Sequence, residues 1–476
     1  MTDFDSISIG TGLYGVKVWI CVLGCRANIY DGEAIAGDLA ARGAVISQDL
    51  KGCRAAVIVS CSVTAVADKK CRQAVRRARR ELGENGIVAV CGCWAQGLGA
   101  EEAKNLGVDI LAGNRRKSDL AEAVESAVTS PSRREMIDMR RLKDGDVTWD
   151  PLALNRPMLR TRAFLKVQEG CDRYCTYCVI PFLRGRPVSR PLDDTEAEAR
   201  RVVEAGCGEI VLTGIHLGMY GRDIGSSLAE LVRRLSGIPG LVRLRLGSLE
   251  PFALDPDDGL LEALASSPVF CPHLHLPLQS GDDDVLARMR RGYTADAFVR
   301  VCDRAREKLG GDLHISSDIL VAFPGESEKA FRATLALMER AELGRIHVFP
   351  YSPRRGTLAA EFPDRIPPRR ASERVTMTRA AGERLLTRYA SRFVGRDLSV
   401  WVESVSVESV SRESVSLENV SMESEGEAVL TGYTRHFVSA GIRFGSAKPS
   451  LGREAEARIT HCVKGELRGY QNERQP

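Results

Sequence analysis

The chain has 476 residues, of which 44% are hydrophobic and 27% charged, and its formal net charge is +4. This length predicts two or three domains, and the composition is typical of a soluble globular protein. No run of about eighteen apolar residues occurs, so we expect no membrane span. The N-terminal segment MTDFDSISIGTGLYG lacks the basic and apolar regions of a signal peptide, so we expect a cytoplasmic address.

The first region, residues 14–130, alternates between strand-like and helical patterns. Apolar runs at 16–22, 55–60 and 86–90 predict strands, and a periodic segment at 31–43 and a basic one at 68–82 predict helices. Alternation of this kind predicts a parallel sheet with helices on its faces. We therefore expect an α/β domain of the flavodoxin-like type.

Three cysteines lie at the carboxyl ends of these predicted strands, where open α/β sheets bind their ligands. They are Cys25, Cys61 and Cys93. Because such strand ends meet at one edge of the sheet, we expect the three side chains to lie together. Nearby cysteines are expected elsewhere: in the strand interiors for Cys21 and Cys91, and on the basic helix for Cys71.

A second series of strand and helix patterns fills residues 157–388. Strands are predicted within 162–170, 209–214, 243–248, 273–279, 314–323 and 345–352. Repeated βα units of this number predict a complete or partial (β/α) barrel, whose chemistry lies at the carboxyl ends of the strands.

The segment EGCDRYCTYCVIP carries Cys171, Cys175 and Cys178 with the spacing Cys-x3-Cys-x2-Cys. Thiolates suit soft metals and iron–sulfur clusters. A structural zinc site would need a fourth ligand, and no cysteine or histidine follows at zinc spacing. Three cysteines on a [4Fe–4S] cluster leave one iron open for a small molecule, so we predict such a cluster here.

This loop, with Tyr177 before its last cysteine, resembles the signature of the radical SAM enzymes. The resemblance implies that the open iron chelates S-adenosyl-L-methionine, whose cleavage gives a 5′-deoxyadenosyl radical. It also places Thr213 and Gly214, at the end of a barrel strand, near the amino group of S-adenosyl-L-methionine. We expect His216 and His275 to be core or rim histidines rather than ligands.

The segments LGCRANIYDGE, VIVSCSVTAVADKKCRQAVRRA and VAVCGCWAQ are similar to N-terminal segments of the methylthiotransferases. The resemblance implies a second [4Fe–4S] cluster on Cys25, Cys61 and Cys93, where sulfur is methylated before its transfer to a substrate carbon. Two positions depart from the family pattern: Gly247, where serine is common, and Ala322, where glycine is common.

Residues 391–470 predict short strands of a small β-barrel and resemble the TRAM domain, which binds RNA. A low-complexity insertion at 401–425 interrupts this pattern, beginning WVESV, SVESV, SRESV. Its five-residue period fits neither helix nor strand, so we expect an extended, solvent-exposed insertion.

The resemblance extends to the branch that converts N6-threonylcarbamoyladenosine, next to the anticodon of tRNA, to its 2-methylthio derivative. It implies a transferase with tRNA as partner, together with an electron donor and a sulfur source that it does not identify. Seven basic residues between Lys69 and Arg80 favour contact with RNA phosphates. Three alternatives stay open: a methylthiotransferase acting on isopentenyladenosine in tRNA, one acting on a ribosomal-protein aspartate, and a non-enzymatic RNA-binding iron–sulfur sensor.

Overall fold

The structure is a computed structural model that describes residues 12–130, 136–140, 148–254, 259–407, 428–444 and 450–471. The chain forms two compact units. The first contains Met1–Met158 and Val179–Arg186, and the second contains Leu159–Cys178 and Pro187–Pro476. The short segment after Cys178 therefore belongs to the first unit, although both of its neighbours in the sequence belong to the second.

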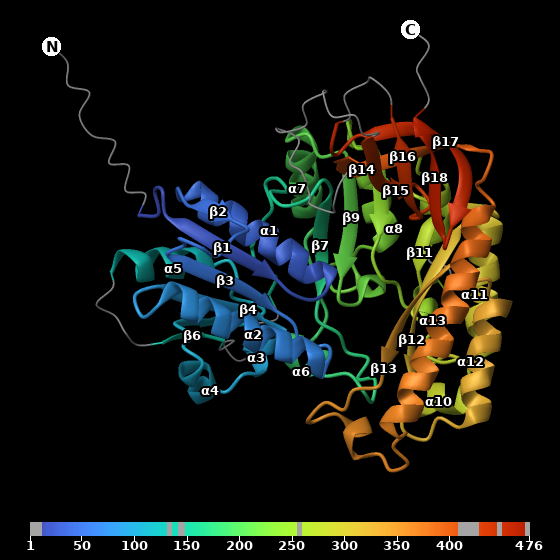
Figure 1. Cartoon of the computed structure of the whole chain (residues 1–476), viewed down its shortest axis with the longest axis horizontal. Helices are drawn as coiled ribbons and strands as arrows, with labels where there is room; N and C mark the ends of the chain where they lie inside the picture. The colour runs from blue at the N-terminus through green and yellow to red at the C-terminus, as the bar shows by residue number, and fades with distance from the viewer. Residues whose placement is uncertain are drawn as a thin grey trace, which may run out of the picture. The chain divides into compact units, whose positions relative to one another are not determined.

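The first unit is built on a parallel sheet with the strand order β2-β1-β3-β4-β5-β6 (Figure 1), which confirms the predicted α/β fold. The strands are β1 Lys17–Val22, β2 Val45–Ser47, β3 Ala55–Ser60, β4 Ile87–Gly92, β5 Ile110–Ala112 and β6 Ile137–Met139. The helices are α1 Arg26–Ala41, α2 Ala65–Leu82, α3 Cys93–Gly97, α4 Ala100–Asn105, α5 Leu120–Thr129 and α6 Ile180–Arg184. Strand β3 is buried along its whole length because helices cover both faces of the sheet.

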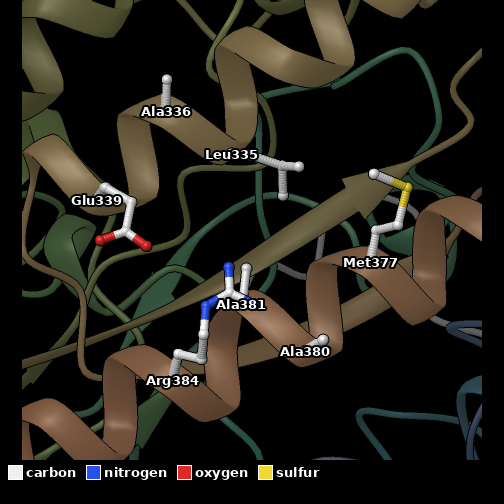
Figure 2. Close-up of a pocket in the computed structure, with 7 residues that line it drawn as sticks. All are labelled: Leu335, Ala336, Glu339, Met377, Ala380, Ala381 and Arg384. Carbon is white, nitrogen blue, oxygen red and sulfur yellow. The ribbon is translucent and has the colours of Figure 1, made fainter.

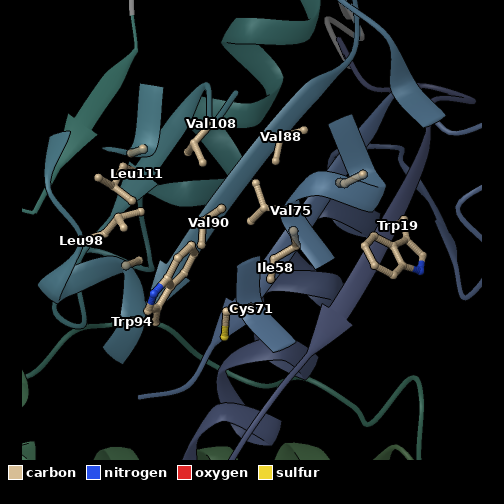
Figure 3. Close-up of a cluster of buried hydrophobic side chains, with 14 of the residues drawn as sticks. Trp19, Ile58, Cys71, Val75, Val88, Val90, Trp94, Leu98, Val108 and Leu111 are labelled. Carbon is tan, nitrogen blue, oxygen red and sulfur yellow. The ribbon is translucent and has the colours of Figure 1, made fainter. Parts of the chain in front are cut away.

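Helix α2 packs its apolar side against this sheet (Figure 3). Val75 and Cys71 of the helix are fully buried with Ile58 and Val90 of the strands. Burying a side chain of the size of valine or isoleucine contributes about 1.5–3 kcal/mol, so this contact fixes the helix on the sheet. The Thr64 side chain caps the helix by accepting a hydrogen bond of 3.2 Å from the backbone N–H of Ala67.

The second unit contains a partial barrel of parallel strands, as predicted. Its strands are β7 Ala163–Glu169, β9 Glu209–Gly214, β10 Arg243–Leu246, β11 His273–His275, β12 His314–Val321 and β13 Arg345–Pro350, with the short antiparallel β8 Val188–Ser189. The strand orders are β10-β9-β7-β8 and β11-β12-β13. Parallel bridges from Leu244 to Phe270 and from Ser248 to His275 join these two groups.

Helices and short turns connect the barrel strands. The helices are α7 Leu192–Glu204, α8 Leu228–Ser236, α9 Leu260–Ala265, α10 Asp283–Arg288, α11 Ala295–Leu309, α12 Glu328–Arg340 and α13 Pro368–Ser391. The 3₁₀ turns are η1 Leu217–Met219, η2 Pro251–Leu254 and η3 Leu358–Glu361. Within the described parts of the chain, no helix is both long enough and apolar enough to cross a membrane.

The C-terminal part of the second unit is a closed barrel with the strand order β14-β15-β16-β18-β17. Its strands are β14 Asp397–Val407, β15 Ala428–Thr434, β16 Ser439–Arg443, β17 Glu454–Val463 and β18 Glu466–Gln471. The first residues of the predicted insertion end strand β14, and Trp401 and Val402 are buried rather than solvent-exposed. Val402 packs in the core of the C-terminal barrel, whereas Trp401 lies against Gly208 and Arg243 of the (β/α) barrel. The rest of the insertion, 408–425, lies outside the described residues.

Two buried arginines of strand β10 join the (β/α) barrel to the C-terminal barrel. Arg243 Nε donates a hydrogen bond of 2.6 Å to Glu454 Oε1. Arg245 Nε donates one of 2.9 Å to Glu209 Oε1, and its Nη2 donates one of 2.8 Å to the carbonyl of Thr434. The contacts with Glu454 and Thr434 cross the boundary that we predict between 157–388 and 391–470, and both regions lie in one compact unit.

Candidate functional site

The first cysteine triad lies at the carboxyl ends of three neighbouring strands of the first unit. Cys25 directly precedes α1 after strand β1, Cys61 directly follows β3, and Cys93 begins α3 after β4. Strand β3 pairs with both β1 and β4, so the three residues lie along one edge of the sheet. Cys61 and Cys93 are buried, and Cys25 is half-buried. The arrangement is the one that the strand-end pattern predicts.

Glycines allow the backbone to turn closely around these cysteines. Gly24 has a φ of +105°, and a Cβ there would lie 2.7 Å from Cys61 Sγ. Gly92 has a φ of +96°, and a Cβ there would lie 2.4 Å from the carbonyl oxygen of Ser60. Any larger residue at either position would therefore push apart the two strand ends that carry the triad.

The thiol of Cys71 is occupied by the backbone next to the triad. Its Sγ lies 3.4 Å from the backbone nitrogen of Cys61 and 3.4 Å from the carbonyl oxygen of Cys61. Cys91 is fully buried inside strand β4, as expected, whereas Cys21 in β1 is half-buried. The strand-end position therefore separates the triad from these nearby cysteines.

A buried arginine contacts the sulfur of Cys93. Arg184 Nε donates a hydrogen bond of 2.9 Å to Cys93 Sγ, and its Nη2 donates one of 2.9 Å to Asn28 Oδ1. Burial raises the pKa of the Cys93 thiol, and the Arg184 guanidinium opposes that shift. Sequence reasoning missed Arg184, because it reaches Cys93 only through the return of the segment after Cys178 to the first unit.

The second cysteine triad occupies the loop that follows strand β7 in the second unit. Gly170 opens the loop with a φ of +76°, and the backbone N–H of Cys178 donates a hydrogen bond of 2.9 Å to the carbonyl of Cys175. Thr176 anchors the loop, since its N–H donates to the Met289 carbonyl at 3.1 Å and its hydroxyl donates to the Arg288 carbonyl at 2.9 Å. The three cysteines are therefore held on one short, tied-down turn.

Another buried arginine, Arg291, contacts this second triad. Its Nη1 donates a hydrogen bond of 3.3 Å to Cys175 Sγ, and its Nη2 forms an ion pair with Glu250. Burial raises the pKa of the Cys171 thiol to about 11. A metal-bound thiolate is deprotonated, so a nearby guanidinium favours the bound form. Arg291 was also absent from the sequence prediction, because its contact with the loop depends on the packing of the turn after α10.

Tyr177 lies in the same loop and packs against Phe323, with ring centroids 6.4 Å apart. Its hydroxyl lies 3.5 Å from Arg291 Nη1. Burial raises the pKa of the Tyr177 hydroxyl well above its ordinary value, while Arg291 opposes the shift. Tyr177 is therefore a neutral, packed residue behind the cysteines.

Thr213 and Gly214 end strand β9, which pairs with the strand that leads into the cysteine loop. Gln168 of β7 ties the two strand ends together: its Oε1 accepts a hydrogen bond of 2.7 Å from the His216 N–H, and its Nε2 donates one of 2.9 Å to the Gly170 carbonyl. His216 is buried as expected. However, neither ring nitrogen has a hydrogen-bond partner among the described residues. Buried polar side chains normally have such partners, so His216 is an exception beside the end of β9.

Both triads fit iron–sulfur ligation by their donor chemistry. Each offers three thiols on constrained backbone next to a buried guanidinium. The soft sulfur ligands match the preference of iron–sulfur clusters.

A surface hollow of about 400 Å³ lies between α12 and α13 (Figure 2). Leu335, Met377 and Arg384 are among its lining residues, and none of the predicted site residues lines it. Its side chains therefore do not suit an iron–sulfur cluster.

Two family models match the chain. The model of the radical SAM superfamily matches residues 165–338, and that of the uncharacterized protein family UPF0004 matches residues 17–113. In a structural comparison, the radical S-adenosylmethionine methyltransferase TsrM from Kitasatospora setae, with cobalamin and a [4Fe-4S] cluster bound, aligns with a TM-score of 0.52 at 14% identity. The alignment covers 73% of this chain and 74% of that chain, and it shows likeness of fold alone.

Sequence relatives cover most of the chain. The threonylcarbamoyladenosine tRNA methylthiotransferase MtaB of Thermotoga maritima is 37% identical over 81% of this chain and 86% of its own length. The protein of the same name from Bacillus subtilis is 34% identical over 92% of both chains. The tRNA-2-methylthio-N(6)-dimethylallyladenosine synthase of Syntrophotalea carbinolica is 33% identical over 80% of this chain and 87% of its own length.

Proposed function

Because the chain belongs to the radical SAM methylthiotransferase family, we propose that it converts N6-threonylcarbamoyladenosine next to the anticodon of tRNA into its 2-methylthio derivative. One observation carries this choice of substrate: the Bacillus subtilis relative named for threonylcarbamoyladenosine aligns over 92% of both chains. That alignment is long enough to include much of all three predicted regions. The enzyme is a transferase that uses S-adenosyl-L-methionine and [4Fe–4S] clusters, as its family does.

We assign one cluster to Cys171, Cys175 and Cys178 and a second cluster to Cys25, Cys61 and Cys93. When bound, the cluster on Cys171, Cys175 and Cys178 would supply the electron that cleaves S-adenosyl-L-methionine. The cluster on Cys25, Cys61 and Cys93 would carry the sulfur that is transferred. Around them, Arg291 and Arg184 donate hydrogen bonds to Cys175 and Cys93. These contacts offset negative charge on buried thiolates.

The S-adenosyl-L-methionine site is assigned to the loop that carries Cys171, Cys175 and Cys178 and to the neighbouring end of strand β9. Thr213 and Gly214 offer backbone and hydroxyl groups at the end of β9, and Tyr177 of the cysteine loop packs against Phe323. The unpaired ring nitrogens of His216 support a polar ligand here, since that residue lies just beyond the same strand end. Gln168 positions this pair of strand ends through its two amide contacts.

tRNA is the proposed partner, and the exposed face of α2 supports it. Lys69, Lys70, Arg76, Arg77 and Arg80 are all exposed on this helix. A row of cations binds phosphates regardless of base sequence, whereas the choice of base must come from the pocket that receives it. A base in the single-stranded anticodon loop can be turned out into such a pocket.

Isopentenyl-type adenosine is the second candidate substrate. Relatives named tRNA-2-methylthio-N(6)-dimethylallyladenosine synthase are 33–35% identical to the chain, which is the identity level of the Bacillus subtilis relative at 34%. Identity at this level supports the shared reaction more strongly than the choice of base. The two candidates differ in the side group on N6 of the same adenine.

The experiment that tests the proposal is mass spectrometry of tRNA nucleosides from a strain that lacks the gene. We expect 2-methylthio-threonylcarbamoyladenosine to disappear while its precursor accumulates, and a plasmid copy of the gene to restore it. Loss of the isopentenyl form instead would establish the second candidate. An unchanged nucleoside profile would contradict both tRNA substrates and direct the search to a ribosomal-protein aspartate or to an RNA-binding sensor.

A further inference from the structure

Three side chains of the (β/α) barrel place metal-binding atoms together, away from both cysteine triads in the sequence. They are His275 in β11, Asp318 in β12 and His347 in β13. Asp318 Oδ1 lies 3.2 Å from His275 Nε2 and 3.2 Å from His347 Nδ1. All three donor atoms lie within 4.8 Å of one another. The proposed methylthiotransferase chemistry leaves this group without a role.

The strand register explains why the three side chains meet. In the parallel β12–β13 pair, Asp318 is the direct partner of His347. In the β11–β12 pair, His275 is the direct partner of Ser316, two residues before Asp318. Residues two apart on a strand point to the same face, so all three side chains lie on one face of these strands. Neighbouring strands hold them more rigidly than loops would.

The distances match those between ligands of a small metal ion. Zinc binds imidazole nitrogen and carboxylate oxygen at about 2.0–2.2 Å, so two ligands at a tetrahedral angle are about 3.3 Å apart. The observed separations of 3.2 Å agree with that value. Two imidazoles and one carboxylate form a donor set that borderline divalent ions such as Zn²⁺ and Fe²⁺ use, with further positions open.

A hydroxyl group orients one of these imidazoles from behind. His275 Nδ1 lies 2.8 Å from Ser316 Oγ, and the same oxygen lies 2.8 Å from His273 Nε2. A histidine that binds a metal through Nε2 usually donates its Nδ1–H to such a partner, which fixes the tautomer. Ser316 Oγ can accept that hydrogen bond from His275 and donate its own O–H to His273 Nε2. With Nδ1 directed at Ser316, Nε2 of His275 faces Asp318 Oδ1 and is available as a metal ligand.

The site opens to solvent on one side. The side chain of His275 is 6% exposed, that of Asp318 24% and that of His347 44%. An ion can therefore enter past His347 while His275 holds it from within. We propose that His275, Asp318 and His347 bind a divalent transition-metal ion, leaving coordination positions for water or for an oxygen atom of a substrate. The burial of His275 agrees with the expectation of a core or rim histidine, and the proposal adds a ligand role to it.

Zinc binding by the cluster-loaded protein tests the proposal. The protein is treated with a chelator that removes loose metal, then equilibrated with Zn²⁺ without oxygen, and its zinc and iron contents are measured. We expect about one Zn²⁺ per chain in the wild type and none in His347→Gln. His461→Gln, which changes an exposed histidine of β17, is the matched control and should bind as the wild type does. Equal zinc in His347→Gln and the wild type would overturn the assignment.

X-ray absorption at the zinc edge identifies the ligands independently. We expect a shell of nitrogen and oxygen with the scattering pattern of two imidazoles, and Asp318→Asn should abolish binding at unchanged iron content. Sulfur in the shell would place the zinc at cysteines and contradict the site. Neither measurement uses tRNA or S-adenosyl-L-methionine. Failure of the metal site is therefore distinguishable from failure of the proposed function.

Discussion

Arg184 is a buried cation that contacts the sulfur of one predicted cluster ligand, Cys93. Its Nε donates a hydrogen bond of 2.9 Å to Cys93 Sγ. Hydrogen bonds to cluster sulfurs favour the reduced, more negative state of an iron–sulfur cluster. In Arg184→Met we therefore expect the reduction potential of the cluster on Cys25, Cys61 and Cys93 to become more negative. A redox titration followed by electron paramagnetic resonance measures this potential.

The neighbouring Arg186 supplies the control for this prediction. Its side chain is exposed, so Arg186→Met removes the same charge at almost the same point of the sequence. The reduction potential of the cluster on Cys25, Cys61 and Cys93 should stay at the wild-type value in Arg186→Met. A cluster that assembles normally in Arg184→Met, with an unchanged potential, would show that the contact has no influence.

His314 makes the stability of the second unit depend on pH. Burial lowers its pKa to about 3, with Arg345 and Arg245 acting in the same direction, although its contact with the His436 carbonyl opposes the shift. In the unfolded chain the His314 imidazole therefore binds a proton as the pH falls through about 6.5, whereas in the folded chain it stays neutral at that pH. The contribution of His314 to the free energy of unfolding is fully present above pH 6.5. It falls as the pH drops toward 3, by up to about 1.4 kcal/mol per pH unit.

Urea unfolding at pH 7.5 and pH 5 measures this dependence. We expect His314→Gln to lose less stability between the two conditions than the wild type does, because the substituted residue takes up no proton. His461→Gln, at an exposed position of the same unit, should keep the wild-type dependence. Equal losses in His314→Gln and the wild type would mean that another group controls the acid sensitivity.

At the scale of elements, helix α2 presents cations on the face opposite its packed side. Arg76 and Arg80 lie one turn apart and are both exposed. We expect Arg76→Gln/Arg80→Gln to weaken tRNA binding and to lower the slope of log affinity against log salt by about one to two units. Filter binding at several salt concentrations measures both quantities.

The control for α2 removes two exposed arginines that already have carboxylate partners. Arg332 pairs with Glu328 on α12, and Arg369 pairs with Glu373 on α13. Because these helix faces are locally balanced, Arg332→Gln/Arg369→Gln should leave the salt slope unchanged. A slope that falls equally in both double variants would point to a general effect of net charge.

Long apolar strands were predictable from the sequence, whereas most short ones were not, with the three-residue β11 as an exception. Strands β1, β3 and β4 and the barrel strands show clear apolar runs, and the strand ends correctly placed Cys25, Cys61 and Cys93 along one sheet edge. Strands β2, β5 and β6 each have three residues, which is too few to show a period of two. The arginines beside the cysteines were missed because their contacts come from tertiary packing alone.

At the scale of the whole chain, an ion pair with a buried arginine connects two β architectures inside the second unit. Arg243 is fully buried, and its Nε lies 2.6 Å from Glu454 Oε1 of the C-terminal barrel. Glu454 is 27% exposed and keeps Arg435 at 3.7 Å, so removing Arg243 costs the charge-assisted hydrogen bond, about 1.5–3 kcal/mol, rather than leaving a buried charge unpaired. We expect Arg243→Met to lower the free energy of unfolding of this unit by about that amount, as measured by urea denaturation.

An exposed pair in the same barrel calibrates this effect. Arg458 Nη1 lies 3.1 Å from Asp397 Oδ2, and both side chains are about half exposed. Because such pairs contribute little, Arg458→Met should cost at most about 1 kcal/mol. Similar losses in Arg243→Met and Arg458→Met would contradict the view that the pair of Arg243 and Glu454 holds the two barrels together.

The central claim is that the two cysteine triads hold separate clusters with separate tasks. The most direct measurement is 5′-deoxyadenosine and methylthiolated tRNA formed by reduced, reconstituted wild type, Cys61→Ala and Cys175→Ala, with iron counted in each. We predict about eight irons in the wild type, cleavage of S-adenosyl-L-methionine without sulfur transfer in Cys61→Ala, and neither product in Cys175→Ala. Full activity with about eight irons in Cys175→Ala, or loss of cleavage in Cys61→Ala, would contradict the account.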